Sequence, residues 1–395
     1  MLRNILAAIV ASAFAVTLMS AQAPSPAQGA PGAGAARQGG GGRGGGGNSH
    51  YPTAEQWAAM PASAVAYVEK AKALAGNDPD LQFDFGIFCA PGGGASNPER
   101  ASIGVPNSEP RLQPFPAPSP ATVVGGQRLF DNFYWIGNTG IGAWLITSND
   151  GYILFDAMNN EEDARDIIIP AMKKLNLDPM KIRYLVFGHH HFDHTGGGEY
   201  IQRLTGAKAV MARDDWEIYL RAPARGGGGG RGRGAARGDA AAAPPVQAAP
   251  APKMKRDIDA TDGMTISIGT GSNAVTATMF QMTGHTPGSI GMVVPVRYQG
   301  RPRPILLVTA GSDVPNRESF VGGYEHIWDE GIKMKVESVM QSHPNTNMNL
   351  LARTKYVHDN YPPAKNPLLY GAERTAKYLN IVRACTQARL EILGW

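Results

Sequence analysis

Cysteine, apolar segments of membrane-spanning length and phosphate-binding loops are scarce or missing in this chain. Its 395 residues include two cysteines, Cys89 and Cys385, too few and too far apart for a four-cysteine structural zinc site. The apolar stretch from Ile5 to Leu18 has about 14 residues, whereas a membrane span needs roughly 20. No glycine-rich tract ends in the Lys-Ser/Thr of a phosphate-binding loop, and no serine-nucleophile elbow is present. These absences argue against a P-loop nucleotidase, a serine hydrolase of the elbow type and a membrane-anchored chain.

The N-terminus has the form of a secretory signal. Arg3 precedes the apolar stretch, and the small residues Ser20-Ala21-Gln22-Ala23 follow it. We therefore expect residues 1–23 to be a signal peptide, and the mature chain to be periplasmic or secreted. No cysteine follows the apolar stretch, so we expect no lipid anchor.

Two tracts have too few large apolar residues to contribute to a core. Residues 24–50 are rich in Gly, Pro and Ala, and we expect a disordered linker. Residues 222–252 are a Gly/Arg and then Ala/Pro insertion, expected to be a surface loop that is either a flap over a cleft or inert. The net charge of the chain is +4, and many of the arginines that contribute to it lie in these tracts. Because the tracts are short and lack interleaved aromatic residues, we expect no nucleic-acid partner.

Residues 51–121 are expected to form an N-terminal extension ahead of a main domain, residues 122–395. Residues 51–75 predict one helix with an internal Pro61, and residues 76–121 predict an irregular segment. The apolar face of that helix would consist of Trp57, Ala64, Val65, Val68, Ala71 and Leu74.

Cys89 and Cys385 would share an oxidising compartment after export. We therefore expect a disulfide that ties the extension to the last predicted helix, Thr375 to Leu390, with two buried thiols as the alternative.

The segment GHHHFDHTGG, residues 188–197, is the most informative part of the chain. Read as His-x-His-x-Asp-His, it places four metal-ligating side chains within six residues: His189, His191, Asp193 and His194. A strand-like stretch (182–187) precedes it and a helix-like stretch (199–204) follows it, so the ligands lie on a loop at a sheet edge. His190 is the odd residue of the run, expected to point away from a metal.

Two more histidines occur in a similar context. His285 lies in MTGHTPGS after an apolar run (274–282), and His343 lies in MQSHP after another. Five histidines and one aspartate make two three-ligand sites, each with open positions for water, as in catalytic rather than structural zinc centres. His50, His326 and His358 have no motif context and are expected to be structural or solvent-facing.

At these residues the chain resembles the metallo-β-lactamase superfamily, and within it the third subclass of zinc β-lactamases. That subclass combines HxHxDH, GHTPGS and a final histidine before proline. The resemblance runs from about Thr122 to Trp395, interrupted by the insertion, and implies an α/β fold: an αββα sandwich of two mixed β-sheets flanked by helices. It also implies two zinc ions per chain. One would be held by His189, His191 and His285, the other by Asp193, His194 and His343.

The strand-like stretches at 130–137, 143–146 and 152–155 fit the same family. The last leads into Asp156, which the resemblance implies as a carboxylate that orients a metal-binding imidazole.

One position separates branches of the superfamily. In glyoxalase II, the lactonases and the phosphodiesterases, an aspartate that bridges both metals ends the strand corresponding to 305–309. Our register places Ser312 there, as in the third lactamase subclass, where it would bind water or a substrate carboxylate. A shift of one residue would place Asp313 there instead.

These features predict an exported zinc hydrolase with a small-molecule substrate. A β-lactam opened by a metal-activated water, oriented by Asp193, is the first reading. A lactone, thioester or phosphodiester is the alternative substrate. A metal- or polymer-binding protein with little catalysis is a third reading, against which the open coordination positions argue. No pattern specifies an oligomeric state.

Overall fold

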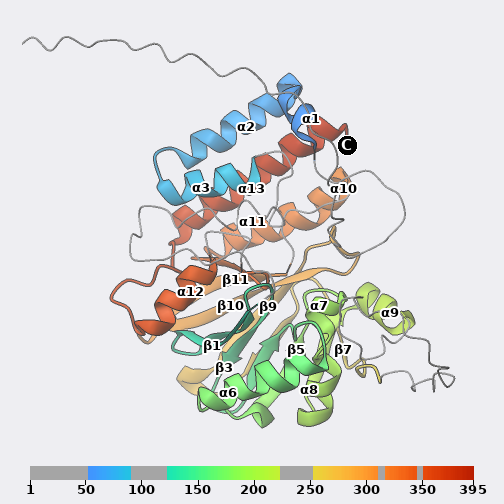
Figure 1. Ribbon diagram of the computed structural model, residues 1–395, viewed down its shortest axis with the longest axis vertical. Helices are drawn as coiled ribbons and strands as arrows, with labels where there is room; N and C mark the ends of the chain where they lie inside the picture. The colour runs from blue at the N-terminus through green and yellow to red at the C-terminus, as the bar shows by residue number, and fades with distance from the viewer. Residues whose placement is uncertain (1–51, 90–121, 223–251, 310–315, 345–349) are drawn as a thin grey trace, which may run out of the picture. The chain divides into compact units, whose positions relative to one another are not determined.

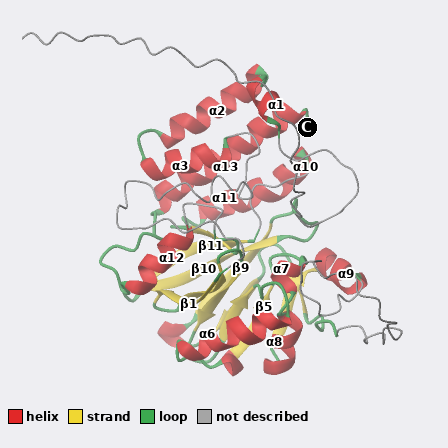
Figure 2. Ribbon diagram, in the orientation of Figure 1, coloured by secondary structure: helices red, strands yellow, loops and turns green. Residues whose placement is uncertain are grey.

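Two β-sheets stack face to face in this computed structural model, with helices on their outer faces (Figures 1 and 2). The structure describes residues 52–89, 122–222, 252–309, 316–344 and 350–395. These residues belong to one compact unit. The predicted αββα sandwich of two mixed sheets is confirmed. Among the described residues, no helix is both long and apolar enough to cross a membrane.

The first sheet has seven strands in the order of the sequence. They are β1 (Val123–Phe130), β2 (Phe133–Asn138), β3 (Gly142–Thr147), β4 (Tyr152–Phe155), β5 (Ile182–Val186), β6 (Lys208–Ala212) and β7 (Ile258–Ala260). Strands β1 to β4 pair antiparallel, and β4 to β7 pair parallel. The carboxyl ends of β4, β5 and β6 therefore share one edge of the sheet.

The second sheet has five strands in the order β12-β11-β10-β9-β8. They are β8 (Thr265–Ile268), β9 (Val275–Gln281), β10 (Ile290–Tyr298), β11 (Arg301–Val308) and β12 (Val339–Gln341). Only β11 and β12 pair parallel. Because β10 is antiparallel to both of its neighbours, β9, β11 and β12 point the same way and end at a common edge.

The core lies between the sheets and continues under the helices on both sides. Along β2, Phe133 and Trp135 face the core between the sheets, while Tyr134 and Ile136 pack under the helices of the first sheet. This alternation is the period of a strand whose two faces are both buried.

The helical segments after β4 include those that cover the outer faces of the two sheets (Figure 2). Those before β7 are α5 (Glu161–Asp163), η1 (Ala164–Ile168), α6 (Ile169–Lys174), η2 (Pro179–Lys181), α7 (Phe192–Thr195), α8 (Gly198–Thr205) and α9 (Arg213–Arg221). Those after β8 are η3 (Gly271–Asn273), α10 (Arg317–Ser319), η4 (Phe320–Glu325), α11 (His326–Lys333), α12 (Leu350–Asp359) and α13 (Ala372–Leu393). Apolar residues of η1, α6 and α8 pack on the first sheet, and those of η4, α11 and α13 on the second.

The predicted extension differs from the expectation in two ways. Residues 51–75 do not form one helix: the chain breaks into α1 (Ala54–Ala58) and α2 (Ala62–Ala75) at Pro61, whose ring nitrogen has no hydrogen to continue the helical hydrogen bonds. The buried face of α2 consists of Ala64, Ala71 and Ala75. Val65, expected on that face, is 44% exposed.

The second correction is a helix inside the segment expected to be irregular. Helix α3 (Pro79–Phe88) begins with Pro79, and the Asp78 side chain accepts the N–H groups of Asp80 and Leu81. An aspartate cap followed by proline is a strong start signal, but here it stands among Gly, Asn and Pro residues that mask it. Residues 90–121 lie outside the described residues.

Covalent and ionic contacts fasten these helices to the C-terminal part of the chain. Cys89 and Cys385 form a disulfide between the end of α3 and α13, which decides between the two alternatives left open by the sequence. Asp80 is buried and pairs with Arg353 of α12 at 2.8 Å and with Arg374 of α13 at 2.5 Å. Helix α2 lies beside α13 (Figure 1).

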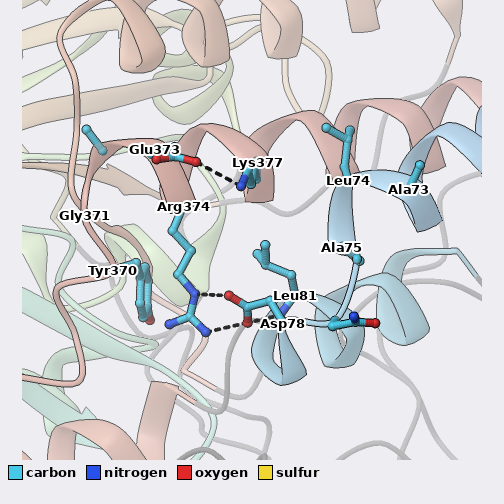
Figure 3. Close-up of a pocket in the computed structure, with 13 residues that line it drawn as sticks. Ala73, Leu74, Ala75, Asp78, Leu81, Tyr370, Gly371, Glu373, Arg374 and Lys377 are labelled. Carbon is cyan, nitrogen blue, oxygen red and sulfur yellow. Dashed lines mark hydrogen bonds and ion pairs between the residues drawn. The ribbon is translucent and has the colours of Figure 1, made fainter.

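A pocket of about 690 Å³ lies among α2, α3 and α13. Arg374 points into it but is held by Asp78, and Lys377 pairs with Glu373 (Figure 3). None of its lining residues belongs to the predicted metal ligands.

The two ends of the predicted insertion are joined where the structure describes them. The Lys253 ammonium donates to the carbonyl oxygens of Tyr219 and Leu220, at 2.9 and 2.5 Å, at the end of α9. Residues 223–251 lie outside the described residues, so a flap role stays a prediction.

Candidate metal centre

The predicted ligands converge where the strand ends of both sheets meet. Loops after β5, β9 and β12 carry them, which places ligands from distant parts of the chain at one end of the sandwich. The cleft outside the carboxyl ends of strands is the usual ligand-binding position in α/β folds.

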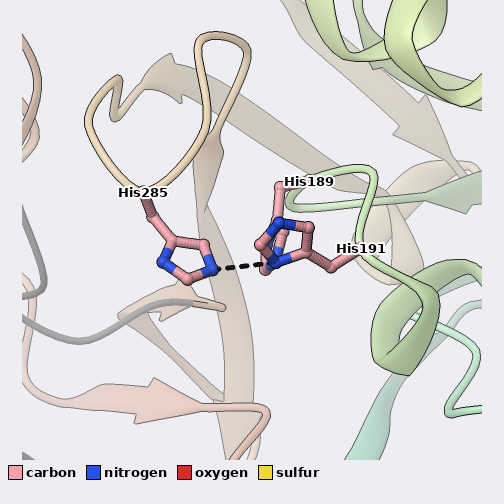
Figure 4. A group of neighbouring side chains, drawn as sticks. All are labelled: His189, His191 and His285. Carbon is pink, nitrogen blue, oxygen red and sulfur yellow. Dashed lines mark hydrogen bonds between the residues drawn. The ribbon is translucent and has the colours of Figure 1, made fainter. Parts of the chain in front are cut away.

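His189, His191 and His285 form the first group (Figure 4). One ring nitrogen of each lies within 4.8 Å of the others. Nδ1 of His191 and Nε2 of His285 face each other at 3.1 Å. Three imidazoles with converging nitrogens are a donor set that suits zinc.

Asp193, His194 and His343 form the second group. Oδ2 of Asp193 lies 3.6 Å from Nε2 of His194 and 3.4 Å from Nε2 of His343. His189, Asp193 and His194 also have ligand atoms within 4.8 Å of one another, so the two groups adjoin. All six predicted ligands are thus brought together.

In three of the histidines, the ring nitrogen Nδ1 contacts another group of the protein. The His194 Nδ1–H donates to Asp156 at 2.8 Å, and the His343 Nδ1–H donates to the carbonyl of Gly140 at 3.1 Å. Nδ1 of His189 lies 3.0 Å from the Thr309 hydroxyl. Such contacts fix the ring orientation and direct the free nitrogen towards a metal.

One buried atom tests whether a metal fits. Nε2 of His189 has no hydrogen-bond partner within the described part of the chain, although it is fully buried. A buried polar atom without a partner is costly. A cation held by His189, His191 and His285 would satisfy it, so the residues present fit a metal.

Burial lowers the pKa values of two histidines in the first group. Burial, reinforced by neighbouring imidazoles, holds the pKa of His189 well below its usual value. Burial and then the nearby His285 lower the pKa of His191 to about 4. At neutral pH both rings are therefore uncharged and keep a lone pair for a metal.

In the second group, two carboxylates affect the pKa values: Asp193, a member of the group, and Asp156 beside it. Burial alone would raise the pKa of Asp193, but the contact with His343 and the charge of His194 outweigh it, so the pKa lies below the usual value. Burial would lower the pKa of His194, but Asp156 raises it. A cation at Nε2 of His194 would thus compete with a proton on that nitrogen, because the raised pKa favours the protonated ring.

Asp156 holds the second group in place, as the sequence suggested. It follows β4 with a φ of 65°, a left-handed conformation that aspartate tolerates better than most residues. Besides His194, it accepts the N–H of Gly188 at 3.1 Å and the Ser342 hydroxyl at 2.6 Å. One carboxylate therefore touches the loops that carry His194 and His343.

Asp215 was missed by the sequence reasoning. It lies in the first turn of α9, directly after β6, fully buried, and its carboxylate contacts His190, Thr286 and Gly288. The available signal was its position: a carboxylate after a parallel strand that ends at the same edge as β4 and β5. His190 points to Asp215, so its expected place away from the metal group agrees with the structure.

Two histidines that were expected to lie outside a metal site have other partners. His326 contacts Asp262 at 2.8 Å, and Nδ1 of His358 accepts the Arg128 N–H. His50, Ser312 and Asp313 lie outside the described residues.

Comparisons with known proteins support the fold and the domain type. Residues 137–295 match the family model described as the metallo-beta-lactamase superfamily. BJP-1, a subclass B3 metallo-beta-lactamase of Bradyrhizobium japonicum, is 22% identical, with 65% of this chain and 90% of that chain covered and a TM-score of 0.50. The Rm3 metallo-beta-lactamase is 20% identical, with 69% and 96% covered and a TM-score of 0.52. At such identities the likeness shows a shared fold.

One curated protein is similar over a short stretch. The hydroxyacylglutathione hydrolase of Maricaulis maris (strain MCS10) is 36% identical over 73 residues. The match covers 18% of this chain and 28% of that protein, so it spans only about a quarter of that relative's length.

Proposed function

We propose that this chain, a hydrolase with a metallo-beta-lactamase superfamily domain, binds two zinc ions and opens the amide of a β-lactam. His189, His191 and His285 would hold one ion, and Asp193, His194 and His343 the other. Zinc bound there would supply a water of lowered pKa as nucleophile and a Lewis acid for the substrate carbonyl.

The residues of the chain would orient and assist this chemistry. Asp193, ionised and beside His343, would accept a hydrogen bond from the attacking water and keep its lone pair directed at the carbonyl carbon. Three imidazoles, which are neutral as metal ligands, would leave the positive charge of their ion undiminished, and this would favour developing negative charge on the carbonyl oxygen. Ser312 would bind water or the substrate carboxylate, a role carried by the motif alone.

The observation that supports this proposal is that six candidate ligand side chains lie together, and that among the described residues the buried Nε2 of His189 has no hydrogen-bond partner. Each group would offer three protein ligands, and a three-ligand zinc site keeps a position for water or substrate. Export is proposed from residues 1–23, which lie outside the described residues.

A thioester is the second candidate substrate. The matched relative is named for the hydrolysis of hydroxyacylglutathione, and Asp313 would provide the bridging carboxylate of that branch if it ends the strand. Lactones and phosphodiesters belong to the same alternative.

The test compares two substrates and two histidine variants. The zinc-loaded chain, with and without a chelator, is assayed on a chromogenic cephalosporin and on an S-acylglutathione thioester, and zinc per chain is measured. His285→Ala should lose one zinc and most activity. His326→Ala, which alters a histidine outside both groups, should keep both. Equal zinc and activity in His285→Ala would overturn the ligand assignment, and turnover of the thioester alone would favour the second substrate.

A further inference from the structure

Asp215 joins the two loops that carry the three-histidine group. Its Oδ2 accepts the main-chain N–H of His190 at 2.8 Å and the Thr286 hydroxyl at 2.7 Å. Its Oδ1 accepts the main-chain N–H of Gly288 at 2.8 Å. His190 stands between two predicted ligands, whereas Thr286 directly follows the third.

The second loop is fastened internally as well. The Ser289 hydroxyl lies 2.7 Å from that of Thr286 and accepts the Thr286 N–H at 3.1 Å. Since Thr286 donates to Asp215, its own hydroxyl oxygen is free to accept from Ser289. The loop therefore reaches the carboxylate as one preformed unit.

The loop packs so closely against Asp215 that a side chain at Gly288 would not fit. A Cβ atom added to Gly288 would lie 2.8 Å from the backbone nitrogen of Asp215 and 2.9 Å from its Cβ. Glycine is therefore required for the loop to approach α9 so closely. A shift of the carboxylate would move this loop, and His285 with it.

Only a carboxylate satisfies the three donors. Burial would raise the pKa of Asp215, but contacts with His190 and Thr286 outweigh it and hold the pKa below its usual value, so the group accepts on both oxygens. Asparagine has one acceptor oxygen and one NH₂ group. In either orientation, an asparagine would place its NH₂ against an N–H or O–H donor.

We propose that Asp215 is a positioning residue that sets the spacing between the loop of His189 and His191 and the loop of His285. This inference rests on the metal centre of the proposed function. It assigns to Asp215, for the three-histidine group, the part that Asp156 plays for the other group.

The test measures metal affinity rather than turnover. Co²⁺ is titrated into metal-free protein in a His343→Ala background, where loss of a second-group ligand leaves the three-histidine group as the main site. The d–d absorption reports coordination geometry, and competition with a chelator gives the dissociation constant. Asp215→Asn is compared with Asp214→Asn, which removes the same charge from the exposed neighbouring position.

Asp215→Asn should bind Co²⁺ about 10- to 100-fold more weakly than Asp214→Asn, with altered absorption bands. Melting curves of the metal-free variants show at which temperatures each variant is folded. A general loss of stability would lower the melting temperature but would leave the Co²⁺ affinity and the absorption bands unchanged well below it. A folded Asp215→Asn with affinity within twofold of its control overturns the inference.

A milder variant covers the case in which Asp215→Asn does not fold. Thr286→Val removes one donor and keeps the carboxylate, and should weaken Co²⁺ binding about fivefold, the effect of one hydrogen bond. An unchanged affinity in Thr286→Val would then overturn the inference. If the parent protein binds no Co²⁺ at all, the proposed metal centre itself is wrong.

Discussion

Replacing Asp80 by asparagine should lower the free energy of unfolding by about 3 kcal/mol. The side chains of Asp80 and Arg353 are 2% and 1% exposed, and the second oxygen of Asp80 pairs with Arg374. Removing one partner of a buried ion pair costs about 3–5 kcal/mol, because the other charge stays buried without compensation. We expect the lower end of this range, because Arg353 keeps the Pro367 carbonyl at 2.9 Å and the Tyr370 ring.

Urea denaturation measures the effect directly. With a slope of about 3 kcal/mol per molar urea, the midpoint should fall by about 1 M. Asp359→Asn is the matched control, because Asp359 pairs with Lys355 on the exposed side of α12, where an ion pair contributes about 0.5 kcal/mol or less. Zinc content should be unchanged in both variants. An Asp80→Asn midpoint equal to that of Asp359→Asn would refute the reasoning that the extension is held by a buried charge pair.

Two further predictions concern the same end of the molecule. The Cys89–Cys385 disulfide joins positions 296 residues apart, for which the chain-entropy relation gives an upper limit of about 5–6 kcal/mol. Cys89→Ser/Cys385→Ser should therefore melt well below the oxidised chain, and equal melting temperatures would contradict this. Burial raises the pKa of Tyr370 to about 12. The folded chain thus keeps a proton that the unfolded chain loses near pH 10, and stability should fall between pH 10 and 12, by at most about 2–3 kcal/mol. Tyr370→Phe should reduce this loss of stability at high pH. A pH profile of stability identical to that of the unmodified chain would contradict the role of Tyr370.

The six residues of the candidate metal centre could be predicted to lie together because their signal is local. HxHxDH, GHTPGS and SHP each lie directly after a strand-like run, and strands that end at one sheet edge bring their following loops together. Asp156 could be predicted in the same way, as the residue directly after β4. Asp215 also follows a parallel strand, in the first turn of α9 after β6, but its role depends on three donors from distant loops, which no spacing in the sequence reveals.

The N-terminal extension was harder to predict because its helix-start signals lie among helix-breaking residues. The start signal of α3 at Asp78 lies among helix-breaking residues, and Pro61 was taken as internal to one helix although it precedes α2. Strand β7 (Ile258–Ala260) was missed because three residues show no periodicity, and only pairing with β6 makes it a strand. The choice between Ser312 and Asp313 depends on a one-residue register beyond β11.

Zinc titration of the metal-free chain, with hydrolysis of a chromogenic cephalosporin followed at each addition, tests the central claim most directly. The account predicts no turnover without zinc, and turnover that rises with zinc and saturates at about two equivalents per chain. Turnover that persists in the metal-free chain, or a chain that binds no zinc, would contradict it.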